Sequence, residues 1–175
     1  QWFEMATEES TPIGNRGVYA GDQEPGSNNI SYLSLTTEGL AVDFGDLNFT
    51  SVLASAVSSR TRGIFTHSWG PGNSQENALD FITIATTGNA TDFGDMTTTH
   101  GAGAGGASSS TRGLIAGGTS PDKNNFIQFI TIQTTGNSTD FGDLTSARGY
   151  PSGMSNSTRG VFAGGYTPTQ VNTID

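Results

Sequence analysis

The chain has 175 residues and a formal net charge of −9, with 16 acidic side chains against 7 basic ones. A surface so poor in lysine and arginine lacks the counterion-releasing groups that nucleic-acid binding requires, and an anionic membrane would repel it, so we expect no nucleic-acid partner and no membrane insertion. The absence of cysteine excludes disulfides, thiolate metal sites and a cysteine nucleophile.

The composition favours short strands joined by many turns. Apolar residues make up only 33% of the chain, and glycine reaches 25 residues. The apolar residues nevertheless gather in short β-branched and aromatic runs, such as residues 129–132, which predicts an all-β fold rather than disorder. No apolar run reaches the length of a membrane span, and no basic-then-apolar signal segment opens the sequence.

One pattern recurs along the chain at a regular interval. The pattern contains two short motifs, which we call the outer box and the middle box. The outer box, Asp-Phe-Gly-Asp, places phenylalanine at positions 44, 93 and 141, and the middle box places an aromatic residue at 32, 81 and 129. Both boxes advance by 49 and then by 48 residues. A period in the forties built of strand-like pieces is typical of a propeller blade or another β-repeat array.

The repeat divides the chain in order. Residues 1–5 match the end of a unit, with Trp2 at the aromatic position, and we interpret them as the outer strand of a preceding or closing blade. Residues 6–47, 48–96 and 97–144 are then predicted to be three whole blades. Residues 145–175 supply a partial blade that stops where its middle strand should begin, so we interpret the chain as a window of a longer repeat protein with a single repeat domain.

Two segments test this organisation. Residues 30–37 alternate so that Tyr32 lies on one face and Leu33 with Leu35 on the other, and we expect both faces to be covered by neighbouring sheets. Residues 101–110 have the glycine, alanine and serine composition of a linker. They stand where the other units place their inner strand, and small residues suit close packing near a propeller axis, so we expect a strand there.

The order of these motifs resembles the Kelch repeat of β-propellers. The positions that carry the resemblance are the double glycines Gly117-Gly118 and Gly164-Gly165, the outer-strand aromatics Trp2, Phe44, Phe93 and Phe141, and Arg148 near the arginine that closes a Kelch unit. The first two units depart from the pattern, with Gly21-Asp22 and His67-Ser68 at the double glycine. The resemblance implies Kelch-like four-stranded antiparallel blades.

The amino-acid sequence of the repeat is similar to that of Kelch-like repeats in structural proteins of tailed phages, especially marine cyanophages. It reads Thr-Arg-Gly-Val-Phe-Ala-Gly-Gly and then Phe-Ile-Thr-Ile-x-Thr-Thr-Gly-Asn-x-Thr-Asp-Phe-Gly-Asp-Leu, and it covers nearly the whole chain. The resemblance implies a non-enzymatic virion protein, in a tail or fibre that serves particle assembly and host-surface attachment. Its implied partners are other virion subunits, including copies of this chain, and a host-surface glycan or protein. The alternative is a bacterial extracellular carbohydrate-binding propeller or adhesin.

The Asp-Phe-Gly-Asp boxes have two interpretations. Their carboxylates, which include Asp46, Asp95 and Asp143, could offer hard oxygen ligands to calcium. Two carboxylates per unit are too few for a shell of about six to eight oxygens. We therefore expect a structural turn that directs the phenylalanine into the interface between blades, and no cofactor.

An Arg-Gly pair also recurs once per unit. Its arginines are Arg16, Arg62, Arg112 and Arg159. A planar guanidinium could anchor an acidic glycan or another subunit. Because an aspartate-bearing box accompanies each arginine, we expect instead an ion pair between the arginine of one blade and an aspartate of the next.

Recognition is expected in the loops, because they vary while the strands repeat. The candidate residues, in loops 66–77 and 119–125, are His67, Trp69, Asn73, Lys123 and Asn124. Trp69 could be an exposed platform for a sugar or a partner, or it could cap the core of its blade. We expect no catalytic and no metal site, because the two histidines occupy non-equivalent positions and no Gly-x-Ser-x-Gly elbow is present.

Overall fold

The computed structural model describes residues 15–21, 27–52, 54–68, 76–100, 102–120 and 122–175. These residues form strands and no helix, which confirms the all-β prediction. The strands are β1 (Arg16–Ala20), β2 (Ser27–Ser34), β3 (Val42–Ser51), β4 (Ala56–Ser58), β5 (Arg62–Thr66), β6 (Ala78–Thr83), β7 (Thr91–Asp95), β8 (Gly105–Ser108), β9 (Arg112–Ala116), β10 (Phe126–Thr131), β11 (Thr139–Asp143), β12 (Ser152–Ser155) and β13 (Gly160–Ala163). Within the described ranges, no helix has the length and apolar character needed to cross a bilayer.

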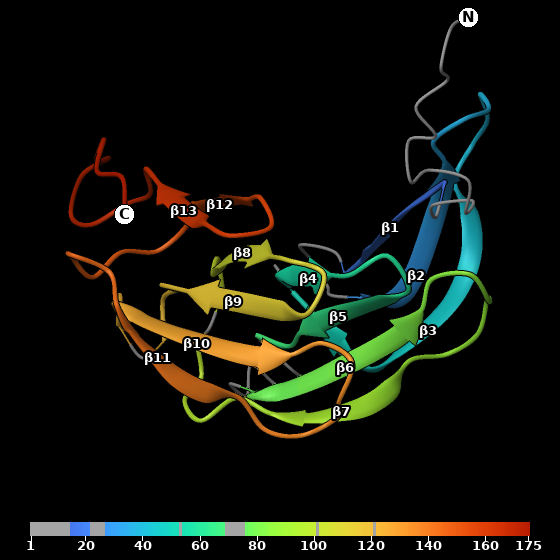
Figure 1. The fold of residues 1–175 in the computed structure, drawn as a ribbon, viewed down its shortest axis with the longest axis horizontal. Helices are drawn as coiled ribbons and strands as arrows, with labels where there is room; N and C mark the ends of the chain where they lie inside the picture. Colours follow the sequence, from blue (N-terminus) through green and yellow to red (C-terminus); the bar gives the residue numbers. More distant parts are fainter. Residues whose placement is uncertain (1–14, 22–26, 53, 69–75, 101, 121) are drawn as a thin grey trace, which may run out of the picture.

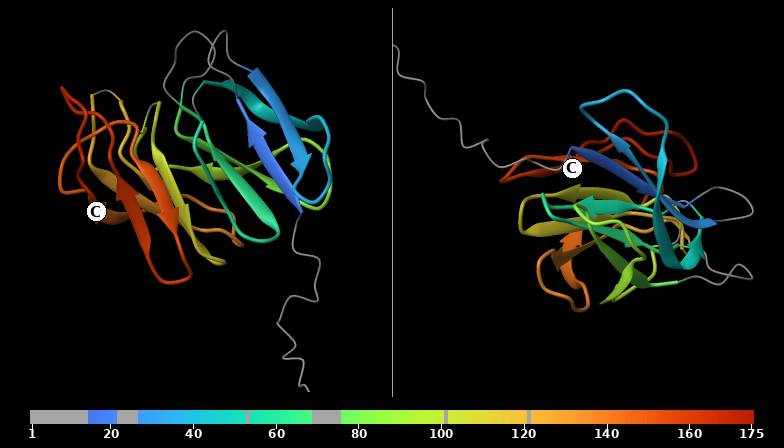
Figure 2. Two further views of the ribbon diagram at one scale, coloured as in Figure 1. Left: turned by 90° about the horizontal axis from the view of Figure 1, so that it is seen from above. Right: turned by 90° about the vertical axis from the view of Figure 1, so that its right-hand side faces the viewer.

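Consecutive strands pair to form four antiparallel sheets. The first sheet contains β1 to β3, the second β4 to β7, the third β8 to β11, and the fourth β12 and β13. Figure 1 shows the sheets following one another along an arc, with the first and the fourth at its two ends. Figure 2 shows the same succession from above. The two four-stranded sheets have the same strand order, so the sequence repeat corresponds to a repeat of structure.

The glycine-rich segment forms the strand that was expected there. β8 pairs with β9 from Gly105 to Ser108, as β4 pairs with β5 in the second sheet. A Cβ atom on Gly106 would collide with the main-chain oxygen of Ala56 in β4, so the close approach of these two inner strands requires a residue without a side chain.

Each Asp-Phe-Gly-Asp box forms a β-bulge within the outer strand rather than a strand end. In the second sheet, Leu79 pairs with Gly94 but Asp80 pairs with Asp92, so Phe93 has no cross-strand partner. The first and third sheets have the same irregularity at Phe44 and Phe141. The ring of this bulged phenylalanine contacts the aromatic residue of the middle strand edge-on. The distances between ring centroids are 6.0, 6.1 and 6.2 Å in the three sheets.

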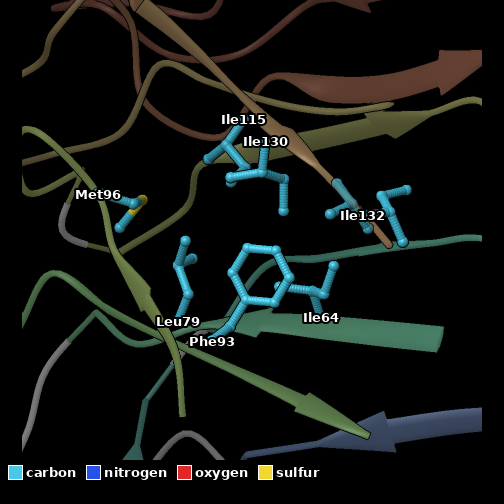
Figure 3. Close-up of a cluster of buried hydrophobic side chains, with 8 residues drawn as sticks. Ile64, Leu79, Phe93, Met96, Ile115, Ile130 and Ile132 are labelled. Atoms are coloured by element: carbon cyan, nitrogen blue, oxygen red, sulfur yellow. The ribbon is translucent and has the colours of Figure 1, made fainter. Parts of the chain in front are cut away.

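The hydrophobic core lies between successive sheets. The cluster between the second and third sheets contains Val57, Ile64, Leu79, Phe93, Met96, Ile115, Ile130 and Ile132, and Figure 3 shows its side chains converging from the two sheets. The preceding interface has a matching cluster around Phe44. Phe44 and Phe93 are each only 2% exposed, so their predicted burial is confirmed.

Two burial predictions are wrong, one in the third sheet and one in the first. Phe141 is 51% exposed, because no described residue covers the position that Ile130 and Ile132 take over Phe93. Leu33 and Leu35 are 38% and 69% exposed, because no described sheet packs on that face of the first sheet. The repeat predicts which side chains face a neighbour but not whether a neighbour is present.

Candidate functional site

The structure does not gather the five predicted recognition residues on one surface. Trp69 and Asn73 lie outside the described residues. His67 and Asn124 are only 1% and 7% exposed, so their prediction as recognition residues is wrong. The main chain of Asn124 is held by Gly118 and Arg148, which ties its loop to the body of the protein. Lys123 is partly exposed, with Nζ 4.7 Å from the centroid of the Tyr166 ring.

At the first two interfaces, a turn of one sheet docks on the outer strand of the preceding sheet. The turn after the third strand of the second sheet donates from Gly88 N to Phe44 O at 2.7 Å and from Ala90 N to the Asp46 carbonyl at 2.8 Å. The side-chain oxygen of Asn89 accepts a hydrogen bond from Asp46 N at 3.2 Å. We call residues 88–90 and 136–138 the docking turns, and residues 44–46 and 93–95 the docking strands.

The same three contacts recur at the next interface. Gly136 N donates to Phe93 O at 2.7 Å, and Ser138 N donates to the Asp95 carbonyl at 2.8 Å. Asp95 N donates to the side-chain oxygen of Asn137 at 3.0 Å. Two interfaces with the same hydrogen bonds at nearly the same lengths show that the docking geometry is specified by the repeat.

Three of the four repeated arginines stack on aromatic rings, and the ion pairs found among the described residues include none of the four, so the predicted pairing with aspartates is wrong. The guanidinium carbons of Arg16, Arg62 and Arg112 lie 4.6, 4.2 and 4.5 Å from the ring centroids of Tyr32, Phe81 and Phe129. Arg16 and Arg62 also donate from a terminal nitrogen to Ile84 O and Ile132 O of the next sheet, at 3.0 and 3.1 Å. Among the described residues, Arg148 forms an ion pair with Asp175, and His67 lies within hydrogen-bond distance of Asp80.

Arg62→Gln is expected to lower the free energy of unfolding by about 1–2 kcal/mol, because it removes a cation–π contact and a charged hydrogen bond between sheets. Chemical denaturation would measure the loss. Arg60→Gln is the matched control, because Arg60 is exposed and lies two residues away, and its loss should stay within about 0.5 kcal/mol. Equal losses in the two variants would contradict a specific role for Arg62.

A polar side chain, buried at Asp80 and Gln128 and partly buried at Asp175, forms a second connection at each interface. Asp80, Gln128 and Asp175 occupy the same place in successive units. Each accepts a hydrogen bond from a main-chain nitrogen of the preceding sheet, four residues after the phenylalanine of its Asp-Phe-Gly-Asp box. The donors are Asn48, Thr97 and Thr145, at 2.8, 2.9 and 2.9 Å. We call these three side chains the polar latches.

Each polar latch also has a nitrogen-bearing side chain beside it. His67 Nε2 lies 2.8 Å from Asp80 Oδ2, His100 Nε2 lies 2.8 Å from Gln128 Nε2, and Arg148 donates to Asp175 Oδ2. Burial raises the pKa of Asp80, but hydrogen bonds from His67 and Asn48 outweigh it, so the pKa lies below its ordinary value. The pKa of Asp175 is lowered in the same way, with burial opposed by Thr145 and Arg148.

His100 fits its site only as the neutral imidazole. Its Nδ1 donates to Gly117 O, while its Nε2 accepts from the Gln128 amide, whose oxygen is already an acceptor for Thr97. Burial lowers the pKa of His100, against a smaller opposing effect of the hydrogen bond to Gly117.

Protonation of His100 is expected to destabilise the fold in mild acid. Because its pKa is lowered in the folded state, the unfolded chain takes up the proton first as the pH falls below about 6.5. Stability is therefore fully present above that pH and is lost as the pH falls toward the folded-state pKa. Urea midpoints at pH 7.5 and 5.5 should differ more for the wild type than for His100→Gln, and equal differences would contradict the assignment.

The paired carboxylates of the described boxes do not gather with other potential metal ligands into a cluster of three or more. Within the described ranges, no group of three or more histidine, aspartate or glutamate side chains lies close enough to hold a metal ion. Asp95 and Asp46 instead contribute main-chain groups to the docking of the next sheet, and Asp140 Oδ1 accepts from Gly142 N within its own box at 3.3 Å.

Four arginines line two adjoining cavities at one end of the sheets. One cavity, of about 480 Å³, includes Arg112 and Arg159 in its wall, and the other, of about 460 Å³, includes Arg16 and Arg60. Hydroxyl and amide side chains of the turns between first and second strands, such as Ser109 and Asn156, line both. We call the four arginines and the turn residues that line these two cavities the arginine face. It concentrates positive charge on a chain whose net charge is −9.

The sequence predictions did not include the docking turns and the polar latches. The Thr-Thr-Gly-Asn wording at residues 86–89 and 134–137 was a usable signal for the turns, because it repeats as strictly as the strands do. The polar latches left no such signal, because Asp80, Gln128 and Asp175 are not the same residue type.

Comparison with models of known protein families finds no match to this chain, and comparison with curated proteins finds none either.

Proposed function

We propose that the chain is part of a Kelch-like β-propeller and acts as a non-enzymatic structural protein in the particle of a tailed phage. Its place would be a tail or fibre, where it contacts neighbouring subunits, including copies of itself, and the host surface. The observation that carries the proposal is the repeated docking of Gly88 on Phe44 and Gly136 on Phe93, each at 2.7 Å.

This docking supports a structural role for a physical reason. The first two interfaces each combine main-chain hydrogen bonds, a buried phenylalanine and a polar latch, and each sheet contacts mainly its neighbours along the chain. Stability in such an array is close to a sum of unit and interface contributions, so units can be added without redesigning the rest. The resemblance of the repeat wording to phage structural proteins connects this architecture to a virion.

Fractionation of particles would test the virion role. A tagged copy of the chain produced in infected cells should co-sediment with capsid and tail proteins through a density gradient. A tagged unrelated all-β protein of similar size is the control and should remain in the soluble fractions. Recovery of this chain only in the soluble fractions, or only with the bacterial envelope, would contradict the proposal.

The second candidate is a bacterial extracellular carbohydrate-binding propeller or adhesin, and the arginine face favours it. Arg60 and Arg159 are exposed beside hydroxyl-rich turns, a chemistry suited to carboxylate or sulfate groups on an acidic glycan. An array of matched acidic and neutral glycans would show binding to the acidic members, reduced in Arg60→Gln and unchanged in Lys123→Gln. Such binding without co-sedimentation with particles would favour this candidate.

A further inference from the structure

A chain of hydrogen bonds connects His100 to the docking turn of the third sheet. His100 Nε2 lies 2.8 Å from Gln128 Nε2. The side-chain oxygen of Gln128 accepts from Ser138 Oγ, and Ser138 Oγ in turn accepts from Thr97 N at 2.9 Å. Ser138 belongs to the docking turn, and its main-chain nitrogen donates to the Asp95 carbonyl. The partners of this histidine are therefore shared with the contact that joins the second and third sheets.

The Gln128 amide suits all of these partners in one orientation. Its oxygen accepts from Thr97 N and Thr97 Oγ1, both at 2.9 Å, and from Ser138 Oγ. Its nitrogen donates to Thr98 O at 3.0 Å and to the Nε2 lone pair of neutral His100. If the amide turned over, its nitrogen would face the donors of Thr97. The amide therefore cannot accept a hydrogen bond from His100 without losing its contacts to Thr97 and Ser138.

A proton on His100 would disrupt this chain of hydrogen bonds. Because Nδ1 already donates to Gly117 O, the added proton must go to Nε2, where it would face the N–H of Gln128. His100 is only 1% exposed, so bulk water does not separate the two opposed donors. Either the ring or the amide has to move, and either movement weakens the support of the docking turn.

No charged partner offsets the cost of that proton. The ionisable side chains on the segments next to His100 and Gln128 are Asp95, Asp122, Lys123, Asp140, Asp143 and Arg148. In the described chain, none of them forms a hydrogen bond with His100, whose ring partners are Gly117 O and the Gln128 amide. Burial is the main cause of the lowered pKa of His100, and the hydrogen bond to Gly117 opposes it.

The preceding interface has the same latch position but a different chemistry. His67 Nε2 lies 2.8 Å from Asp80 Oδ2, and a carboxylate accepts from Nε2–H whether or not Nδ1 carries a second proton. Burial raises the pKa of Asp80, but its hydrogen bonds hold the pKa below the ordinary value, so the carboxylate stays ionised in mild acid. Ala90 stands at the position of Ser138, so no hydroxyl connects this latch to its docking turn.

We propose that the interface between the second and third sheets is an acid-sensitive joint, which opens when His100 takes up a proton while the interface between the first and second sheets stays closed. In the open form, docking turn 136–138 has left docking strand 93–95. The open form binds the proton at the ordinary histidine pKa of about 6.5, and the closed form does not. Opening is therefore favoured as the pH falls below about 6.5, by up to about tenfold for each pH unit. The inference goes beyond the proposed function and does not depend on the virion role.

Hydrogen exchange detected by NMR on the full chain would test the proposal at pH 7.5 and 5.0. Each amide is expressed as a protection factor, which removes the pH dependence of intrinsic exchange. The reporters are Gly136 and Ser138, and the controls are Gly88 and Ala90, whose main-chain hydrogen bonds have the same lengths of 2.7 and 2.8 Å. Protection of the reporters should fall at least about tenfold in acid, and that of the controls less than about twofold.

Two outcomes of the wild-type measurement would overturn the proposal. Unchanged protection at the reporters would show that the joint does not open. An equal loss at reporters and controls would show that acid acts on the whole fold and not on one interface. Neither outcome bears on co-sedimentation with particles, which is measured at neutral pH, so failure here is distinguishable from failure of the proposed function.

Two variants connect the effect to the side chains. His100→Gln has no group to protonate at this position, so the acid-induced loss at the reporters should shrink to less than about twofold. Gln128→Glu places a carboxylate beside His100, as Asp80 lies beside His67, and its reporters should be at least as well protected at pH 5.0 as at pH 7.5. A tenfold loss that persists in either variant would overturn the assignment to His100. If a variant does not fold, the wild-type comparison still decides.

Discussion

Replacing Phe93 by alanine should lower the free energy of unfolding by about 3–5 kcal/mol, because the substitution leaves a cavity at the centre of an interface between sheets. The ring is 2% exposed and belongs to a cluster drawn from both the second and the third sheet. It also loses the edge-on contact with Phe81, whose centroid lies 6.1 Å away. Urea denaturation would measure the loss.

Phe141→Ala provides the matched control for Phe93→Ala. The two rings occupy the same position in the repeat and have similar edge-on partners, at 6.1 and 6.2 Å. Because Phe141 is 51% exposed, its truncation should cost only about 1 kcal/mol. Similar losses in the two variants would show that burial between sheets is not what stabilises these rings.

Gly94→Ala should destabilise the fold by more than backbone strain alone explains. Gly94 has a φ of 138°, where a side chain is strained at a cost of about 1–3 kcal/mol. Its added Cβ would also lie 2.6 Å from the main chain of Gly136, so the docking turn must move away and weaken its hydrogen bonds. We expect a total loss of about 3–5 kcal/mol, measured by thermal or urea unfolding.

Gly142→Ala separates the two effects. Gly142 has a φ of 139°, so its backbone strain matches that of Gly94, but a Cβ there meets nothing within 4 Å. The control variant should lose only the strain contribution, about 1–3 kcal/mol. If Gly94→Ala cost no more than Gly142→Ala, the close approach of the docking turn would have no part in holding the sheets together.

The sequence predicts what recurs in it, and the structure shows why the prediction stops there. Two boxes with one stride located the middle and outer strands, and the burial of Phe44 and Phe93 followed from their shared position. The exposure of Phe141 could not be predicted from its own box, because burial depends on residues of a neighbouring sheet. Local sequence determines which way a side chain points, and the next unit determines whether it is covered.

The role of the repeated arginines depended on strand register, which composition does not reveal. Arg62 pairs with Thr83 across the sheet, so Phe81 is the diagonal neighbour of Arg62 on the same face. The ring of Phe81 lies beside Arg62 in the same sheet. An ion pair would instead require the guanidinium to extend to an aspartate of the next sheet. Counting charges per unit predicted the wrong partner, whereas the strand pairing explains the observed one.

The polar latches were beyond prediction for a different reason. Asp80 and Gln128 perform one task, accepting a hydrogen bond from the main chain of the preceding sheet, although one is an acid and the other an amide. Either side chain offers an oxygen at the right distance, so selection for the contact does not fix the residue type. The stride of the middle box marks the two positions as equivalent, since they directly precede Phe81 and Phe129, but only the structure shows that both make the same contact.

The docking contacts give the second sheet an inequivalent front and back, because it docks on the first sheet through Gly88 and receives the third sheet at Phe93. A turn projects from one face, and the strand that receives a turn lies on the other, as Gly136 and Phe93 show for adjacent sheets. Two identical faces placed about a two-fold axis cannot reproduce that contact, so assembly that reuses it must be heterologous, head to tail. Copies joined in this way add in a single direction, and the rotation from one sheet to the next decides whether they close into a ring or extend as a filament.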